Sequence, residues 1–222
     1  MQDKLITDLP KEDSFVRSRQ ETGSFCGPCV MQMLLSQFGI LADQKEIVIA
    51  CGAAETVMKA GIPPKQLILG IKKLYPEVAV WQKSNSNLED IEKLISGGYL
   101  VAFDWQGIFA GDEYGDDVLP GFWEKVATRI KKEPVLLGDQ GHYCIALEVN
   151  GGKGYLRFAD PYGHYAGKDR FVALWEFEER WWDDRLDKDE TGKIVRVIEE
   201  RLIFVLTKMG DHFPASLGME EV

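Results

Sequence analysis

The chain has 222 residues, of which 45% are hydrophobic, and its formal net charge is −10. This length allows one large domain or two tightly packed lobes, with a core that needs neither disulfides nor a metal ion. The acidic balance argues against nucleic-acid binding and against binding to anionic membranes, and four cysteines are too few for a secreted disulfide scaffold.

The N-terminal sequence MQDKLITDLPKEDSF is charged throughout, so it lacks the apolar core of a signal peptide. No run of the sequence approaches the roughly 18 apolar residues of a membrane span. We therefore expect a cytoplasmic protein with free thiols, without a cofactor or a bound metal, and with no nucleic-acid or membrane partner.

Apolar periodicity predicts a mostly helical first half. The first helix begins at or just after Cys26, and Gly39 suits its C-terminal cap. The other predicted elements of this half are helices at Gln44–Ala54, from Pro63-Pro64 onward and at Asn87–Ser96, and a short strand at Val78–Trp81.

The second half favours antiparallel strands. They are expected at Tyr99–Phe103, His142–Val149, Tyr155–Ala159, Ile194–Ile198 and Leu202–Leu206, with helices at 122–131 and Leu174–Asp183. The fold class is therefore α+β. We expect a single domain with a helical lobe over about residues 15–98, a β-rich lobe over about 99–208 and a tail at 209–222.

Cys26 is the candidate nucleophile because it stands where the first helix starts. Unpaired N–H groups and the positive end of the helix dipole favour a thiolate at such a position. Gln20, six residues earlier, could donate a side-chain N–H to a developing oxyanion.

His142 and Asp160 are the candidate base and its orienting acid. A hairpin turn centred on Gly151 and Gly152 places His142 opposite roughly residue 161, with Asp160 adjacent or diagonal at the same open end. Pro161 holds Asp160 in an extended conformation at the rim. The carboxylate would hold the histidine in one tautomer, and the cysteine, far away in the sequence, would be the nucleophile. These are the three roles of a catalytic triad.

The tetrapeptide Cys26-Gly27-Pro28-Cys29 also permits a dithiol redox reading. A polar, turn-like segment precedes it, whereas a thioredoxin motif follows a buried strand, so we expect Cys29 to be a packing residue. Cys51 and Cys144 are expected in the core, and the four cysteines lack a zinc-binding spacing. His164 and His212 are interpreted as surface residues. The segment Asp187–Gly192 resembles the start of a calcium loop but is predicted to be a turn that joins a helix to the strand at Ile194.

Several motifs resemble the bacteriocin-processing (double-glycine leader) cysteine peptidases, family thirty-nine of the cysteine peptidases within the papain-like superfamily. The motifs are Gln20-x5-Cys26-Gly27-Pro28, Gly141-His142-Tyr143, Asp160-Pro161, Gly61-Ile62-Pro63-Pro64 and Glu176-Phe177 with Trp181-Trp182. The resemblance implies a papain-like fold with the active site between the lobes. It implies Cys26 as nucleophile, His142 as base and acid, Asp160 as orienter and Gln20 in the oxyanion hole. Cys29 departs from the small residue usual in that family, and the segment at 104–140 is longer than the resemblance implies. We expect no attached transporter domain, so the resemblance does not imply bacteriocin export.

The sequence therefore predicts a papain-like cysteine hydrolase that cleaves a peptide or isopeptide bond in a peptide or protein substrate, through a thioester on Cys26. An acidic loop at Gly111–Asp117 could favour basic substrates. Acyl transfer by the same triad, a non-catalytic binding module with a papain-like shell, and a dithiol oxidoreductase remain as alternatives.

Overall fold

The computed structural model describes residues 15–107, 141–188 and 190–222. The predicted helix at 122–131 and the acidic loop at Gly111–Asp117 lie outside these residues. Among the described residues, none of the helices is both long and apolar enough to cross a membrane.

The predicted helices of the first half are confirmed, with shifts at their ends. The α-helices are α1 (Cys26–Ser36), α2 (Gln44–Ala50), α3 (Val57–Ala60), α4 (Pro64–Leu74), α5 (Leu88–Ser96) and α7 (Leu174–Arg180), with short 3-10 turns at Gly163–Tyr165 and Ala215–Leu217. Asn87 caps α5 as expected, and Asp90 bonds back to the Asn87 N–H to complete a capping box. The α3 helix was not predicted. The predicted second helix is shorter because Gly52, with φ of 67°, ends it.

The strands are β1 (Val78–Lys83), β2 (Val101–Gln106), β3 (Gly141–Asn150), β4 (Tyr155–Ala159), β5 (Asp169–Ala173), β6 (Trp182–Lys188), β7 (Ile194–Glu200), β8 (Ile203–Lys208) and β9 (Glu220–Glu221). Of these, β5, β6 and β9 were not predicted. The prediction of a helix running to Asp183 was wrong, because the chain leaves α7 at Arg180 and forms β6 from Trp182. The segment Asp187–Gly192 consequently joins two paired strands, β6 and β7, and not a helix and a strand.

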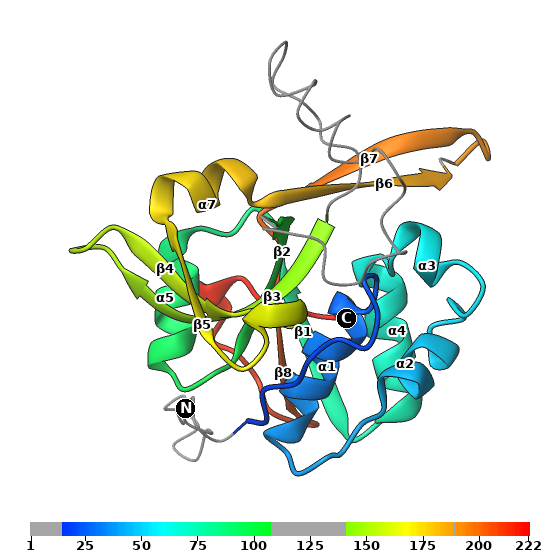
Figure 1. Cartoon of the computed structure of the whole chain (residues 1–222), viewed down its shortest axis with the longest axis horizontal. Coiled ribbons are helices and arrows are strands. Elements are labelled where there is room, and N and C mark those ends of the chain that lie inside the picture. Colours follow the sequence, from blue (N-terminus) through cyan, green and yellow to red (C-terminus); the bar gives the residue numbers. More distant parts are fainter. Residues whose placement is uncertain (1–14, 108–140, 189) are drawn as a thin grey trace.

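One antiparallel sheet carries the fold. Its strand order is β5-β4-β3-β2-β8-β1-β9, and a second, two-stranded sheet is formed by β6 and β7. This hairpin reaches out from the body of the molecule (Figure 1). The large sheet takes β1 from before residue 98 and β9 from the tail, so it joins segments from the whole length of the chain.

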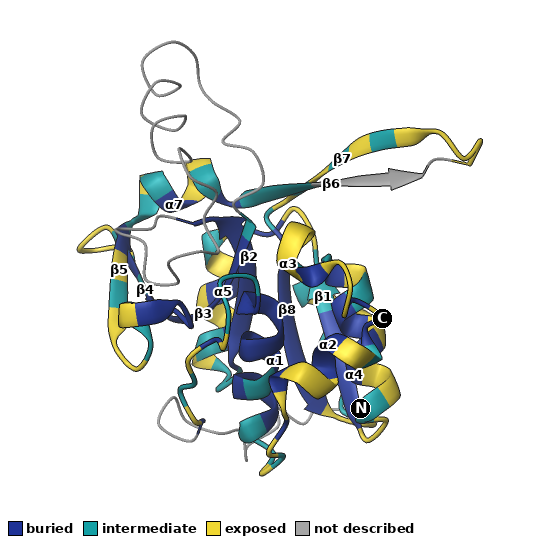
Figure 2. Cartoon of the chain, turned by 45° about the vertical axis from the view of Figure 1, so that its right-hand side comes forward, coloured by how far each residue is buried: buried dark blue, intermediate teal, exposed yellow. Residues whose placement is uncertain are grey.

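The two faces of the sheet are covered by different helices (Figures 1 and 2). Alternate residues of β8 show this clearly, because Phe204 and Leu206 pack with α1, α2 and α4, whereas Ile203 and Val205 pack with α5 and α7. Both faces are therefore apolar cores, which explains why β8 reads as a continuous hydrophobic run.

The predicted register of the β3–β4 hairpin was wrong in detail. The turn takes four residues, Gly151–Gly154, so that Asn150 pairs with Tyr155. The register then shifts between Ala146 and Glu148, and Ile145 pairs with Ala159. The shift is a bulge. It compensates for part of the longer turn, and it leaves Asp160 just beyond the paired region, beside the start of β3.

Candidate active site

Helix α1 places Cys26 at its first position, where the residue is only 8% exposed. The first N–H groups of an α-helix have no partner within the helix, and Cys26 stands at this end of α1. Gly27 fits closely between two other elements, because a β-carbon there would lie 3.1 Å from Leu67 of α4 and 3.2 Å from the ring of Tyr143 on β3. Tyr143 in turn donates its hydroxyl to the Ile62 carbonyl, at 3.1 Å. The start of α1 is therefore fixed against the strand that carries His142.

The loop before α1 is tied to the segment that carries Asp160. The backbone N–H of Gln20 donates to the Pro161 carbonyl at 2.9 Å. The side-chain amide of Gln20 donates to the carbonyls of Thr22 and Gly23, at 2.7 and 2.9 Å. In this state both hydrogens of that amide shape the loop that leads into Cys26.

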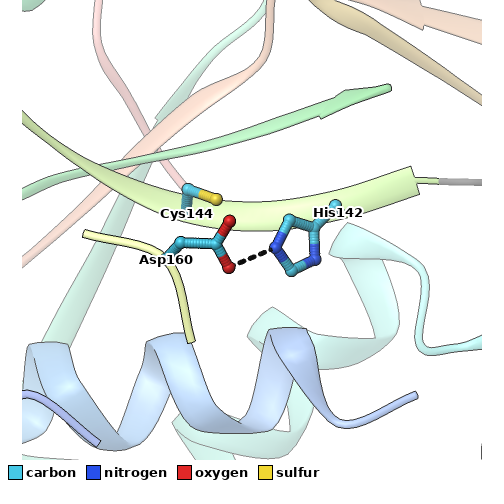
Figure 3. Close-up of side chains that lie close together, drawn as sticks. All are labelled: His142, Cys144 and Asp160. Carbon is cyan, nitrogen blue, oxygen red and sulfur yellow. Dashed lines mark hydrogen bonds and ion pairs between the residues drawn. The ribbon is translucent and has the colours of Figure 1, made fainter. Parts of the chain in front are cut away.

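His142 and Asp160 form a buried hydrogen-bonded pair, as the hairpin predicted. His142 Nε2 lies 2.8 Å from Asp160 Oδ1, and each residue is 2% exposed (Figure 3). A carboxylate can only accept, so Nε2 carries the hydrogen and the lone pair of the neutral ring is on Nδ1. The pair is thus a histidine fixed in one tautomer by an acid.

The carboxylate of Asp160 is held from two further sides. The backbone N–H of Tyr162 donates to Oδ1 at 2.8 Å, and the guanidinium of Arg170, on β5, donates to Oδ2. Arg170 is itself packed over the ring of Tyr165, with 3.8 Å between its guanidinium carbon and the ring centroid. Asp160 is therefore fixed by the turn after β4 and by the neighbouring strand.

The pKa values of this pair move apart. Burial alone would raise the pKa of Asp160, but the charge and hydrogen bond of His142 and the charge of Arg170 outweigh it and lower that pKa. Burial alone would lower the pKa of His142, whereas negative charge at Cys144 and Asp160 raises it well above its usual value. Burial raises the pKa of Cys144 to about 11, so Cys144 is a neutral thiol at neutral pH. The charge of Asp160 is therefore what keeps the pKa of His142 raised at that pH. The environment favours an imidazolium next to a carboxylate.

Cys144 was predicted to be a core residue, and it lies in the core beside this pair. Its sulfur, a ring nitrogen of His142 and a carboxylate oxygen of Asp160 all lie within 4.8 Å of one another (Figure 3). A metal would need Cys144 as a thiolate, which its raised pKa disfavours, and zinc in structural sites takes four ligands. The chemistry of the set does not favour a metal.

The other cysteines and histidines lie where the sequence placed them. Cys29 and Cys51 are buried free thiols, and burial raises the pKa of both, to about 11 for Cys51. The segment before Cys26 is a loop and not the buried strand of a thioredoxin. His164 and His212 are exposed.

Three polar residues near the pair were missed by the sequence analysis. Arg170 contacts Asp160, as described above. Asp104 lies on β2 and is paired with Tyr143 of β3. Asp183, on β6, accepts a hydrogen bond of 2.9 Å from Gln106 of β2. A signal for Asp104 was present, because it is a charge within the apolar run of β2. Nothing in the spacing pointed to its neighbour Asp183.

A helix that starts at a cysteine packs on an antiparallel sheet, in which one strand carries a histidine and the neighbouring strand ends just before its aspartate partner. This arrangement is that of the papain-like cysteine peptidase fold. Solved structures agree. The chain superposes on a family-thirty-nine-like peptidase from Bacillus anthracis with a TM-score of 0.53 at 13% identity, over 87% of this chain and 94% of that one. The peptidase domain of Streptococcus ComA, a bifunctional ABC transporter of a quorum-sensing pathway, gives a TM-score of 0.51 at 13% identity, over 87% of this chain and 98% of that one.

A double-glycine-motif protease from an AMS/PCAT transporter, solved with its leader peptide, aligns with a TM-score of 0.46 at 13% identity, over 87% and 96% of the two chains. The fold assignment rests on the other two. No protein-family model and no curated protein sequence matches the chain. At this identity the likeness establishes the fold, which is that of the peptidase family that the sequence motifs resemble.

Proposed function

We propose that the protein is a cysteine peptidase-like hydrolase that cleaves a peptide or isopeptide bond through a thioester on Cys26. The observation that carries the proposal is the buried hydrogen bond of 2.8 Å between His142 and Asp160. It supports a base of fixed tautomer, and the fold supplies a cysteine at the start of a helix that packs on the same strand. The substrate class is a peptide or a protein.

The reaction follows from these positions. His142 takes the thiol proton on Nδ1, and the Cys26 sulfur attacks the substrate carbonyl to form a tetrahedral oxyanion. The imidazolium returns the proton to the leaving amine, which departs as the carbon–nitrogen bond breaks and the thioester forms. Water activated by His142 then attacks the thioester, and the carboxylic acid leaves as the Cys26 thiol is restored.

The oxyanion requires donors at the start of α1. Backbone N–H groups at a helix N-terminus provide them, and Gln20 adds a second donor when its amide exchanges the bond to the Gly23 carbonyl for one to the oxyanion. Of the two bonds made by that amide, the one to Gly23 is the longer. A cytoplasmic location, where thiols stay reduced, suits this chemistry.

A pair of matched cysteine variants tests the proposal. Cys26→Ala is expected to lose both peptide turnover and labelling by a peptidyl acyloxymethyl ketone. Cys29→Ala is the control, because Cys29 is a buried thiol one turn further along α1; it is expected to keep both. Intact-mass and peptide-mass analysis locate the label. Labelling of Cys29 or Cys51 that persists in Cys26→Ala would reject the assignment, and transfer to an added amine in preference to water would indicate an acyltransferase.

A further inference from the structure

The β6–β7 hairpin reaches away from the body of the molecule (Figure 1). Among the described residues its sheet consists of β6 and β7 alone, so no described strand lies on the far side of β7. A two-stranded hairpin by itself is marginally stable in water, and an unpaired strand edge can accept a further strand. The outer edge of β7 is therefore a candidate interaction surface.

A hydrogen bond at the base of the hairpin shows which backbone groups of β7 point outward. The Glu200 carbonyl accepts a hydrogen bond of 2.9 Å from the backbone N–H of Asn85, which lies outside the hairpin. Inward and outward groups alternate along a strand of an antiparallel pair, so the backbone groups of Ile198, Arg196 and Ile194 also point away from β6. In the described part of the chain these three residues have no backbone partner on that side. The open edge therefore runs from Ile194 to Ile198 and ends where Asn85 covers Glu200.

The sequence of this edge reads the same in both directions, Ile194-Val195-Arg196-Val197-Ile198. Ile194 and Ile198 are 63% and 53% exposed, and Val195 and Val197 are half-buried on the opposite face. In an antiparallel pair of two copies centred on Arg196, Ile194 of one copy lies opposite Ile198 of the other, and Val195 lies opposite Val197. Apolar side chains therefore meet apolar side chains on both faces, a favourable cross-strand pairing.

The charges of the strand suit the same register. Lys193 of one copy lies opposite Glu199 of the other, so a positive and a negative charge face each other at both ends of the pair, which is favourable across strands. The two copies of Arg196 meet at the centre. Each guanidinium is already paired with Asp184 of its own hairpin, and this carboxylate reduces the repulsion between the two arginines.

An open crevice at the inner end of the edge provides room for the turn of a second hairpin. It has a volume of about 260 Å³ and is lined by Ser84, Asn85 and residues 197–200. Because Arg196 is midway between positions 192 and 200, Gly192 of the second copy lies opposite Glu200. Gly192 has a φ of 82° and no side chain, so its turn can approach the crevice closely.

We propose that two copies of the chain associate through their β7 edges and join two hairpins into one four-stranded antiparallel sheet, with a two-fold axis at Arg196. Each pair of outward-facing residues exchanges two backbone hydrogen bonds, and both copies use the same surface, as a two-fold interface requires. The partner is a second copy because the apolar and the charged positions of β7 both match their own copy in this register. A contact of this small size associates reversibly.

Sedimentation equilibrium tests the association. At concentrations from about 1 μM to 1 mM, where weak complexes dissociate, we expect the wild type to show a monomer–dimer equilibrium. Ile194→Pro removes one outward N–H from each copy, and it is expected to raise the dissociation constant about 10-fold or more. Leu41→Lys is the control, because it replaces an apolar side chain that is 91% exposed outside the hairpin; it is expected to keep the wild-type dissociation constant.

Thiol cross-linking tests the register and does not depend on the proline variant. Opposed side chains of an antiparallel pair have β-carbons about 5 Å apart, whereas the two copies of Ile194 would be about 13 Å apart along the strands. A mixture of the Ile194→Cys and Ile198→Cys proteins is therefore expected to be joined by dibromobimane, which links closely spaced thiols. Either variant alone is expected to give little cross-linked dimer, and peptide-mass analysis locates the link.

The possible results distinguish a second copy from other occupants of the edge. A monomer at every concentration overturns the proposal, and so does a dimer whose dissociation constant is unchanged in folded Ile194→Pro. Equal cross-linking of the mixture and of each variant alone overturns the register centred on Arg196. If the chain stays monomeric and a peptide substrate protects the thiol of Ile198→Cys from alkylation, the edge binds a substrate strand and self-pairing is rejected.

Discussion

Asp160 shows how a carboxylate can remain ionised inside a protein. It accepts hydrogen bonds from His142, from the Tyr162 backbone and from Arg170. Together these donors offset the loss of water that burial imposes. Because the carboxylate is fixed on the sides away from His142, it holds the ring in one orientation. The residue is thus both an electrostatic and a geometric partner of the histidine.

The effect of Asp160 on His142 predicts a shift in the pH profile. The raised pKa of His142 keeps the imidazolium to higher pH, and activity that depends on an imidazolium–thiolate pair is lost as pH rises through that pKa. Replacing Asp160 with Asn removes the negative charge and lowers the pKa of His142. The basic limb of the Cys26 labelling rate is therefore expected to move to lower pH, with a rate reduced about 100-fold or more at its maximum.

Asp169→Asn is the matched control for this experiment. Asp169 is an acid on β5 that pairs with Arg17 and Arg157 at the surface, and its loss is expected to leave the basic limb in place. Rates measured from pH 5 to 10 with a neutral electrophile avoid ionisation of the probe. An unmoved basic limb in Asp160→Asn would show that Asp160 does not set the charge of His142.

At the scale of elements, α4 packs on both α1 and α2. Its close approach to α2 therefore helps to fix where α1 begins. Leu67 of α4 contacts the position of Gly27, next to the ring of Tyr143 on β3, so α4 and β3 together support the start of α1. Gly70, one turn further along α4, lies directly against Cys51 at the end of α2. A β-carbon at Gly70 would lie 3.0 Å from the Cys51 backbone nitrogen and 3.1 Å from its Cα. The absence of a side chain at Gly70 permits this contact.

The substitution Gly70→Ala therefore has two opposing effects on the free energy of unfolding: a higher helix propensity raises it, and crowding against Cys51 lowers it. Alanine gains about 1 kcal/mol of helix propensity, but crowding in a packed core costs about 1–3 kcal/mol, and backbone atoms of Cys51 cannot rotate away. We expect a net loss in the free energy of unfolding, measured by urea denaturation. Gly151→Ala, in the open β3–β4 turn, should change it by less than about 0.5 kcal/mol. A stabilised Gly70→Ala variant would contradict the close packing of α2 on α4.

At the scale of the whole molecule, the sequence predicted what depends on local pattern. The start of α1, the capped α5 and the His142–Asp160 contact follow from caps, apolar periodicity and a hairpin. By contrast, β6 is rich in charge and tryptophan, and it forms a strand because β7 pairs with it. Two-residue β9 exists through its pairing with β1. Asp104 and Asp183 are brought together by the hydrogen bond between Gln106 and Asp183, residues 77 positions apart, and no spacing rule predicts that.

The position of β1 predicts that the chain unfolds as one unit. This strand comes from the helix-rich first half, yet its partners are β8 on one side and β9 on the other. Separating the helix-rich first half of the chain from the second half would break the pairing of β1 with β8 along the whole length of the two strands. It would also expose the apolar cores on both faces of the sheet. Local unfolding of the helices alone is therefore costly, and we expect a single cooperative transition.

Buried thiols on both halves provide a direct measurement of this cooperativity. Cys29 and Cys51 lie with the helices and Cys144 lies on β3, and all three are free and buried. Brief thiol labelling across a urea series, with each cysteine quantified by mass spectrometry, is expected to give one midpoint for the three residues. Far-ultraviolet circular dichroism should give the same midpoint. If Cys29 and Cys51 became reactive at lower urea than Cys144, the helical part would be a separate folding unit, and the sheet would not bind the two halves into a single domain.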